Sequence, residues 1–453
     1  MAITSDVLVV GGGLAGITAA LSAAREGVDV RLVSHKASTL RQASGLIDAL
    51  GYIPATEPAD QLREGPPSAK RRLHRDEWPD PDGPVVDPFE AIEQLPPEHP
   101  YRLVGPDALR DGLALFDDIV GELYRGGHTD RNALLPTFGG SVKPTARYPA
   151  ASAAGIASDP RSMLIVGFPW QPEYDARLVA DRLAAADVPF EVAGVEVEFA
   201  SEFAADTSIT RFATAFDRND MIDGTPARAA LATAVEDALA AVDGGADRVG
   251  FPAFLGDSDS AEVRAEIADR LGADVFEIPT GPPSLPGLRL EDTLFGALED
   301  AGVRFETGNP VVGHELCSPT TVESVLVDRM GREVPYTAEE FVLATGGLVG
   351  MGIESDREGV SEPVFDCHVP HPADRYDWFV DDVFGDQPYA RFGVDADEQL
   401  RPRDAEEAVQ YRNVRVVGAT LGSADVAREK SASGVSLATG TEAGRLAATE
   451  VQR

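Results

Sequence analysis

The stretch DVLVVGGGLAG, from Asp6 to Gly16, decides the fold. Residues 6–10 form a short apolar run rich in β-branched side chains, which is typical of a strand buried on both faces. A glycine-rich turn leads into a predicted helix over residues 14–26, and a second strand is predicted over residues 28–33. The sequence therefore predicts a complete β-α-β unit within its first residues.

The turn carries the pattern G-x-G-x-x-G at Gly11, Gly13 and Gly16. In such a turn the first glycine permits the tight bend, the second lets a phosphate approach the backbone, and the third lets helix and strand pack closely. The helix N-terminus adds free N–H groups and the positive end of a dipole. We therefore expect binding of a nucleotide or flavin phosphate; the alternative is a glycine turn in an unliganded α/β domain.

The second strand ends in Ser34-His35-Lys36, where a dinucleotide site usually carries Asp or Glu to hold the adenosine ribose. This difference weakens an NAD hypothesis and favours FMN, with FAD held through serine or backbone groups as the alternative. Four small residues follow: Ser38, Thr39, Ser44 and Gly45. We expect them to line the phosphate and ribityl groups of the flavin; the alternative is a serine-rich loop without a ligand.

The chain of 453 residues has 39 Lys and Arg against 76 Asp and Glu, a net charge of −37. So acidic a surface repels nucleic acid and anionic lipid, and neither is expected as a direct partner. Lysine occurs only at Lys36, Lys70, Lys143 and Lys430. This composition indicates a halophilic protein, since molar salt screens self-repulsion; an ordinary acidic mesophilic protein is the alternative.

Two cysteines, Cys317 and Cys367, stand 50 positions apart, and neither belongs to a C-x-x-C pair. An iron–sulfur cluster or zinc site held by this chain alone is therefore not expected. No apolar run approaches the roughly 20 residues that span a bilayer, and residues 1–6 lack the pattern of a signal peptide. We expect a cytoplasmic protein that reaches a membrane only peripherally, through partner subunits.

Later segments complete the predicted architecture. Residues 54–100 are rich in proline, and residues 162–278 alternate between predicted strands and helices. An apolar strand at residues 341–347 runs into Gly346, a strand at residues 413–417 runs into Gly418, and Ser433-Gly434 opens a last helix. In a flavoprotein these glycines lie under the flavin, and the last helix points its dipole at the C2 carbonyl. An NAD dehydrogenase or a non-catalytic α/β module is the alternative.

The predicted fold class is α/β, with a discontinuous Rossmann-like flavin-binding domain and an inserted second α/β domain. The flavin-binding domain is expected to comprise residues 1–50, 284–365 and 400–453. A Pro-rich acidic extension would cover residues 51–100, the inserted domain residues 101–283, and a loop segment facing substrate or a partner residues 366–399.

Segments over most of the chain resemble the B-type flavoprotein subunits of anaerobic glycerol-3-phosphate dehydrogenase. They are residues 9–16, ASGLIDAL (43–50), HPYRLVG (99–105), PPSLPGLRL (282–290), LATGG (343–347), QPYARFG (387–393), DADEQLRP (395–402) and residues 413–440 with GATLG and SGVSLATG. PPSLPGLRL, QPYARFG and LRP are far more specific to the family than the glycine loop. The acidic surface and the lengthened stretch 54–100 depart from its pattern.

The resemblance implies an FMN-containing subunit of a complex that oxidises sn-glycerol 3-phosphate to dihydroxyacetone phosphate. The implied partners are a catalytic subunit with FAD and an iron–sulfur subunit that anchors the complex and passes electrons to membrane quinone. The missing cluster cysteines and membrane segment agree with a need for such partners. Three alternatives stay open: an electron relay with catalysis on the partner, a stand-alone fumarate-reductase-like flavoenzyme, and a flavin-free structural partner.

Oxidation of a secondary alcohol by flavin needs hydride transfer and a base for the hydroxyl proton. His368 and His371 are candidate bases, and no metal is expected between them because Pro370 rules out a helical pair. A phosphate on the substrate calls for arginine, and the candidates are Arg289, Arg391, Arg401 and Arg403. Each arginine has a surface ion pair as its alternative role.

Overall fold

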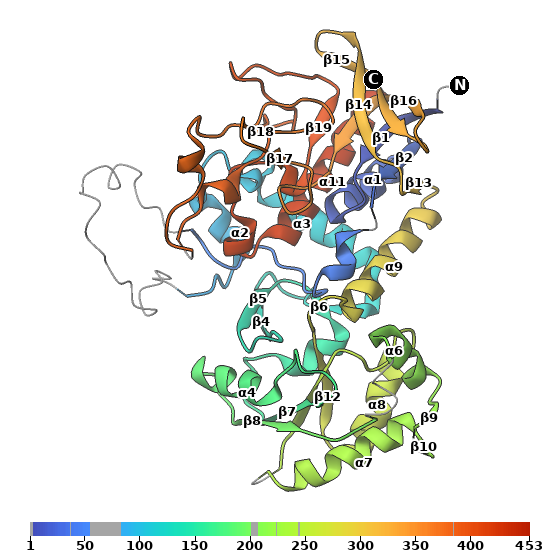
Figure 1. Cartoon of the computed structure of the whole chain (residues 1–453), viewed down its shortest axis with the longest axis vertical. Coiled ribbons are helices and arrows are strands. Elements are labelled where there is room, and N and C mark those ends of the chain that lie inside the picture. Colours follow the sequence, from blue (N-terminus) through green and yellow to red (C-terminus); the bar gives the residue numbers. More distant parts are fainter. Residues whose placement is uncertain are drawn as a thin grey trace, which may run out of the picture.

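The computed structural model describes residues 3–36, 38–54, 83–200, 207–222, 224–242, 245–383 and 385–453. Two lobes are visible in Figure 1: a large lobe around a seven-stranded sheet and a small lobe around a four-stranded parallel sheet. Of the expected Pro-rich extension at residues 51–100, residues 55–82 lie outside the described residues.

The large lobe draws its sheet from both ends of the chain. Its strands are β1 (Ile3–Val10), β2 (Val30–Ser34), β13 (Arg304–Thr307), β14 (Val311–Ser318), β15 (Thr321–Asp328), β16 (Glu333–Leu343) and β19 (Val414–Val416). The order is β13-β2-β1-β16-β15-β14, and β19 also pairs with β16. Val9 of β1 lies opposite Leu32 on one side and Val342 on the other, in parallel register. This sheet confirms the predicted discontinuous Rossmann-like domain.

Strand β16 begins well before the apolar strand that is predicted at residues 341–347. Its first half pairs antiparallel with β15, and its last residues pair parallel with β19. Polar residues such as Thr337 and Glu339 interrupt the apolar pattern between the two halves. One strand therefore appears in the sequence as two short ones.

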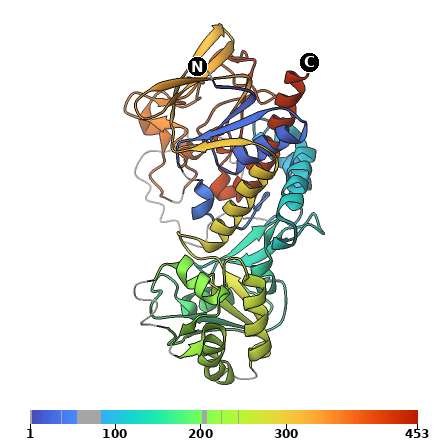
Figure 2. The same cartoon turned by 90° about the vertical axis from the view of Figure 1, so that its right-hand side faces the viewer.

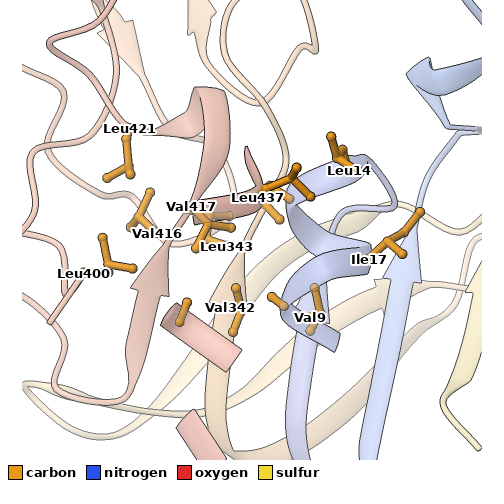
Figure 3. Packing of buried hydrophobic residues seen from close by; sticks show 14 of the residues in the cluster. Val9, Leu14, Ile17, Val342, Leu343, Leu400, Val416, Val417, Leu421 and Leu437 are labelled. Atoms are coloured by element: carbon orange, nitrogen blue, oxygen red, sulfur yellow. The ribbon is translucent and has the colours of Figure 1, made fainter. Parts of the chain in front are cut away.

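Helices α1 (Leu14–Arg25) and α11 (Ala432–Val451) pack closely because glycines face backbone across their interface. A Cβ on Gly440 would lie 2.6 Å from the carbonyl oxygen of Ala15, and one on Gly444 would lie 2.3 Å from that of Ala19. Figure 3 shows the apolar core next to this contact, where side chains of β1, α1, β16, β19 and α11 meet. This core holds the glycine turn and the last helix together.

Helix α3 (Pro100–Val120) is a feature that the sequence pattern does not predict. Pro106 and the positive φ of Gly105, 80°, interrupt its helical pattern. The helix packs on α11, where a Cβ on Gly112 would lie 2.7 Å from the carbonyl oxygen of Leu437. The first residues of the range 101–283 thus contribute to the core of the large lobe.

The small lobe contains β7 (Met163–Gly167), β8 (Val192–Glu196), β11 (Arg248–Pro252) and β12 (Asp274–Ile278), all parallel, in the order β12-β11-β7-β8. Its helices are α4 (Ala176–Ala185), α6 (Ile209–Asp217), α7 (Ala227–Ala240) and α8 (Ser260–Leu271). This lobe confirms the second α/β unit. Figure 2 shows α9 (Leu285–Asp300) leading from the small lobe back along the large one.

Short elements complete the described chain. They are α2 (Pro88–Ala91), β3 (Tyr124–Arg125), β4 (Ala133–Pro136), β5 (Val142–Thr145), β6 (Tyr148–Pro149), β9 (Met221–Ile222), β10 (Thr225–Pro226), β17 (Glu354–Ser355), β18 (Val360–Ser361) and α10 (Val426–Glu429). Strands β4, β5 and β6 lie between the lobes in Figure 1, where Ile47 bridges to Arg147.

Candidate functional site

The glycine turn joins the end of β1 to the start of α1. Gly11 has a φ of 121°, and a Cβ there would lie 2.1 Å from the carbonyl oxygen of Ala344. A Cβ on Gly16 would lie 2.0 Å from the carbonyl oxygen of Gly11. The packing of the turn against α1 and β16 therefore excludes side chains at both positions.

Gly13 differs from these two glycines. Its φ of −80° and ψ of 179° suit any residue, and the nearest atom to a Cβ there is Thr39 Oγ1 at 4.0 Å. Gly13 is the N-cap of α1, and no side chain caps this helix end. First-turn N–H groups without a cap need an acceptor, and a phosphate is well suited to supply it. The residues present at this turn thus fit the phosphate of a flavin.

The end of β2 carries no carboxylate at Ser34, His35 or Lys36. Ser34 Oγ donates to the carbonyl oxygen of Lys36 at 2.9 Å, and Lys36 Nζ lies 2.9 Å from Met351 Sδ. Ser38 Oγ accepts from the N–H of Leu40 at 3.2 Å, so it orders the turn that presents Thr39 to Gly13. This loop places hydroxyl groups and one ammonium group near the open turn.

Ser44 and Gly45 lie where the loop meets the start of α9. Ser44 Oγ accepts from Leu46 N at 3.3 Å, and Tyr124 Oη donates to the carbonyl oxygen of Gly45 at 2.9 Å. Gly45 has a φ of 75°, and a Cβ there would lie 2.8 Å from Pro286 Cβ. The structure gives both residues local contacts that order the loop.

The turns after β16 and β19 are brought to the same edge of the sheet as the glycine turn. Gly346 N donates to Thr420 Oγ1 and Gly418 N to Thr439 Oγ1, each at 2.9 Å. A Cβ on Gly418 would lie 2.7 Å from the Cβ of Ala15 in α1. The carboxyl ends of parallel strands meet at this edge, which is where open α/β sheets bind ligands.

Thr345 is a residue of this edge that the sequence pattern does not single out. Its Oγ1 is buried and has no hydrogen-bond partner within the described part of the chain. A buried hydroxyl without a partner is unfavourable by about 1–3 kcal/mol. A bound group that hydrogen-bonds to Thr345 would remove this penalty.

The start of α11 is already capped from within the chain. Ser433 N donates to Asp48 Oδ1 at 3.0 Å, and Asp48 Oδ2 lies 3.0 Å from Lys143 Nζ. A Cβ on Gly434 would lie 2.1 Å from Tyr101 Oη. In this structure Ser433 and Gly434 thus have capping and packing contacts, and the ASGLIDAL segment supplies the capping carboxylate.

The two candidate bases differ in their surroundings. His371 Nδ1 lies 2.6 Å from the carbonyl oxygen of Val369, and its Nε2 accepts from Val360 N at 3.3 Å, so both ring nitrogens are engaged. His368 is exposed. Burial raises the pKa of Asp395, and the charges of His368 and Arg403 oppose that rise. His368 therefore lies close to Asp395 and Arg403, and its ring has no hydrogen-bond partner among the described residues.

Three of the four candidate arginines bind carboxylates of the chain itself. Arg289 pairs with Glu277 at 2.7 Å, Arg391 with Asp386 at 2.7 Å, and Arg401 with Asp397 at 2.7 Å. The fourth, Arg403, lies near Asp395. The structure therefore does not gather these arginines into one phosphate site.

A cavity of about 540 Å³ lies beside the turn that follows β16. Its lining comes from two segments, residues 348–355 and 378–392: Leu348, Met351, Ile353, Glu354, Ser355, Trp378, Phe379, Tyr389 and Phe392. The second segment lies within the loop region 366–399 that is expected to face substrate or a partner. That a substrate or a partner meets this segment stays a prediction.

A second cavity of about 350 Å³ has a charged lining. Glu340 and Arg401 lie on it together with Gln399, Arg412, Asn413, Arg415, Glu450 and Arg453. Arg415 Nη1 donates to Glu340 Oε2, and both side chains are buried. Burial raises the pKa of Glu340 from 4.5 to about 7, although Arg415 opposes the rise.

This pair predicts a dependence of stability on pH. The folded protein holds the Glu340 proton more tightly than the unfolded chain does. The protonation of Glu340 therefore contributes fully to the free energy of unfolding below pH 4.5, and this contribution is lost as pH rises through about 7. Relative to the wild type, Glu340→Gln should gain up to about 3 kcal/mol of unfolding free energy between these values. Urea unfolding in molar KCl at several pH values measures this difference. Glu442→Gln, which removes a carboxylate paired with Arg445 on α11, is the control. A pH-independent difference for Glu340→Gln would contradict the prediction.

The described residues also bear on metal and membrane sites. Their side chains form no group of three or more His, Cys, Asp or Glu residues suited to a metal ion. None of their helices combines the length and the apolar character that crossing a bilayer requires.

Comparison with known proteins agrees with this geometry. A family model described as an FAD binding domain matches residues 6–435. A protein of Halobacterium salinarum, named as a probable B-type subunit of anaerobic glycerol-3-phosphate dehydrogenase, is 55% identical, with 100% of this chain and 99% of that protein aligned. The chain belongs to this family of anaerobic glycerol-3-phosphate dehydrogenase subunits. A Pectobacterium atrosepticum protein of the family is 29% identical over 95% of this chain and 96% of its own length.

The comparison with solved structures finds flavoenzymes at low sequence identity and low TM-score. The open form of a flavocytochrome c3 fumarate reductase has a TM-score of 0.43 and 10% identity, covering 100% of this chain and 79% of the other. A 3-ketosteroid-delta4-(5alpha)-dehydrogenase from Rhodococcus jostii RHA1 has a TM-score of 0.40 and 12% identity, covering 100% and 97%. Family membership makes the chain a flavin-containing oxidoreductase subunit of a multi-subunit complex, and the Halobacterium relative fits its halophilic composition.

Proposed function

We propose that this chain is the FMN subunit of a complex that oxidises sn-glycerol 3-phosphate to dihydroxyacetone phosphate. Its partners would be a subunit containing FAD and an iron–sulfur subunit at the membrane, which passes electrons to a quinone-linked acceptor. The names of the relatives support the substrate. The observation that carries the flavin assignment is the uncapped start of α1, with open space over Gly13.

The end of β2 supports FMN over FAD. An adenosine ribose is usually held by a carboxylate at this position, and Ser34-His35-Lys36 offers none. The terminal phosphate of FMN carries close to two negative charges at neutral pH, more than either phosphate of a dinucleotide. The ammonium group of Lys36 supplies a positive charge at this end of the sheet.

Bound flavin would supply the hydride acceptor of the reaction. The chain's own contribution begins with the N–H groups at the start of α1, which would hold the phosphate, and with Thr345, which would bind a polar group of the cofactor. His368 would accept the hydroxyl proton, because its ring is available while that of His371 is engaged on both sides.

Anaerobic reduction of the flavin tests this function. The chain is purified in molar KCl, loaded with FMN and mixed with sn-glycerol 3-phosphate, while the flavin absorbance is recorded. We expect bleaching by the chain alone. Bleaching only after the FAD-containing subunit is added would make the chain an electron relay, and reoxidation by fumarate would favour the stand-alone enzyme. Absence of bleaching both with and without the FAD-containing subunit would contradict the proposed function.

A further inference from the structure

Lysine is rare in this chain, and two of its four lysines lie together. The other 35 basic residues are arginines, since Lys and Arg total 39. Arginine presents a broad planar fork, whereas the lysine ammonium is a compact point charge with three donors. A protein that otherwise uses arginine thus places two lysines, Lys143 and Lys430, at one site.

Three segments converge at this site, beside the start of α11. A Cβ on Gly51 would lie 2.9 Å from Lys430 Cβ and 3.2 Å from Pro144 Cβ. Lys143 Nζ lies 3.0 Å from Asp48 Oδ2, and Asp48 Oδ1 caps Ser433 N. The two lysines therefore come from distant parts of the sequence to the same side of the large lobe.

The donors of the two ammonium groups are mostly unused. Lys430 Nζ donates to the carbonyl oxygen of Ala427 at 2.7 Å, and Lys143 Nζ contacts Asp48. Across the residues that the structure describes, neither group has a further partner, which leaves four of six N–H donors free. Burial lowers the pKa of Lys430, and the charge of Lys143 lowers it further. The charges of Asp48 and Asp425 oppose this lowering, and the ion pair with Asp48 neutralises one of the two ammonium groups.

The neighbouring carboxylate of Glu429 makes its hydrogen bonds to other groups and not to these lysines. Its Oε2 lies 3.1 Å from His99 Nε2 and accepts from Ser431 Oγ at 2.8 Å. Its Oε1 accepts from Asp425 N at 3.0 Å. Asp48 is then the one carboxylate among the described residues that directly contacts either ammonium group.

We propose that Lys143 and Lys430 bind the phosphate of a phosphate monoester. Two ammonium groups with free donors form short, charge-assisted hydrogen bonds to a phosphate dianion. Two sources share this chemistry: the substrate sn-glycerol 3-phosphate and inorganic phosphate. The assignment to the substrate rests on the proposed function, while phosphate binding does not.

Phosphorus-31 NMR titration of the flavin-loaded protein in molar KCl tests the site, with inorganic phosphate and sn-glycerol 3-phosphate as separate probes. We expect Lys430→Met to lower the affinity for both probes by about tenfold or more, since one charge-assisted contact is lost. Lys430→Arg should recover part of the affinity. Arg445→Met, which removes an exposed charge paired with Glu442 elsewhere on α11, is the control and should bind normally.

The outcomes separate the possibilities. Lys143→Met should weaken phosphate binding in the same way. If Lys143→Met unfolds because Asp48 loses its partner, the test rests on Lys430→Met. A thermal unfolding curve shows whether Lys430→Met is folded. Unchanged affinity in Lys430→Met, or no phosphate binding by the wild type, would overturn the proposal. Loss of flavin with unchanged binding of both probes would also overturn it and assign the lysines to the cofactor. Weaker binding of inorganic phosphate by Lys430→Met, together with no flavin reduction by glycerol 3-phosphate in the wild type with or without the FAD-containing subunit, would keep the site and reject the proposed function.

Discussion

Replacing Gly13 with valine should leave the protein folded and remove its flavin. The backbone at Gly13 suits any residue, and a Cβ there meets no atom closer than Thr39 Oγ1 at 4.0 Å. The added side chain would occupy the space from which a phosphate approaches the N–H groups of α1. Loss of one to two charge-assisted contacts lowers flavin affinity by about 100-fold. Absorbance of the purified protein at the flavin bands measures retention.

Two other glycines are the controls for this variant. A Cβ on Gly281 also has no atom within 4 Å, so Gly281→Val should fold and keep its flavin. A Cβ on Gly16 would lie 2.0 Å from the carbonyl oxygen of Gly11, so Gly16→Val should lose stability along with flavin. A Gly13→Val protein that keeps the wild-type flavin content would show that the phosphate lies elsewhere.

Arg289→Met should reduce the free energy of unfolding by about 3 kcal/mol. Arg289 in α9 of the large lobe pairs with Glu277 in β12 of the small lobe, and the Glu277 side chain is 0% exposed. Its Nη2 also donates to the carbonyl oxygen of Gly256. Removing the guanidinium leaves a buried carboxylate without its partner across the lobes. Urea unfolding in molar KCl measures the loss, because urea leaves the ionic strength unchanged.

Arg391→Met provides the matched control. Arg391 pairs with Asp386 at the surface, with 31% and 54% of the two side chains exposed, so its loss should change stability by less than about 1 kcal/mol. If Arg289→Met were equally mild and instead weakened the binding of glycerol 3-phosphate, Arg289 would be a phosphate ligand and its ion pair with Glu277 would be secondary.

The fold could be predicted where it depends on a sequence pattern of neighbouring residues. The apolar strand before Gly11 and the glycine spacing identify the β-α-β unit. Gly11 is required by its close contact with the backbone of Ala344 and Gly16 by its contact with the backbone of Gly11, while Gly13 leaves room for a phosphate. Helix α3 was missed because Pro106 and Gly105 break the pattern that identifies a helix. Its stability comes from packing on α11, which is more than 300 residues away in sequence.

The site was predictable only in part for the same reason. Gly346 and Gly418 follow apolar strands, and the strand order brings them to the glycine turn. The cap of Asp48 on Ser433 and the approach of Lys143 to Lys430 join distant segments and leave no pattern in the sequence. Arg289 illustrates a further limit, since residue type does not distinguish a phosphate ligand from the partner of a buried carboxylate.

Acid release of the bound cofactor, followed by chromatography against FMN and FAD standards, tests the central claim most directly. The protein is purified in molar KCl and its flavin content is compared with its protein concentration. We expect one FMN per chain. A colourless protein that stays empty after incubation with either flavin would contradict the assignment of the glycine turn as a flavin phosphate site.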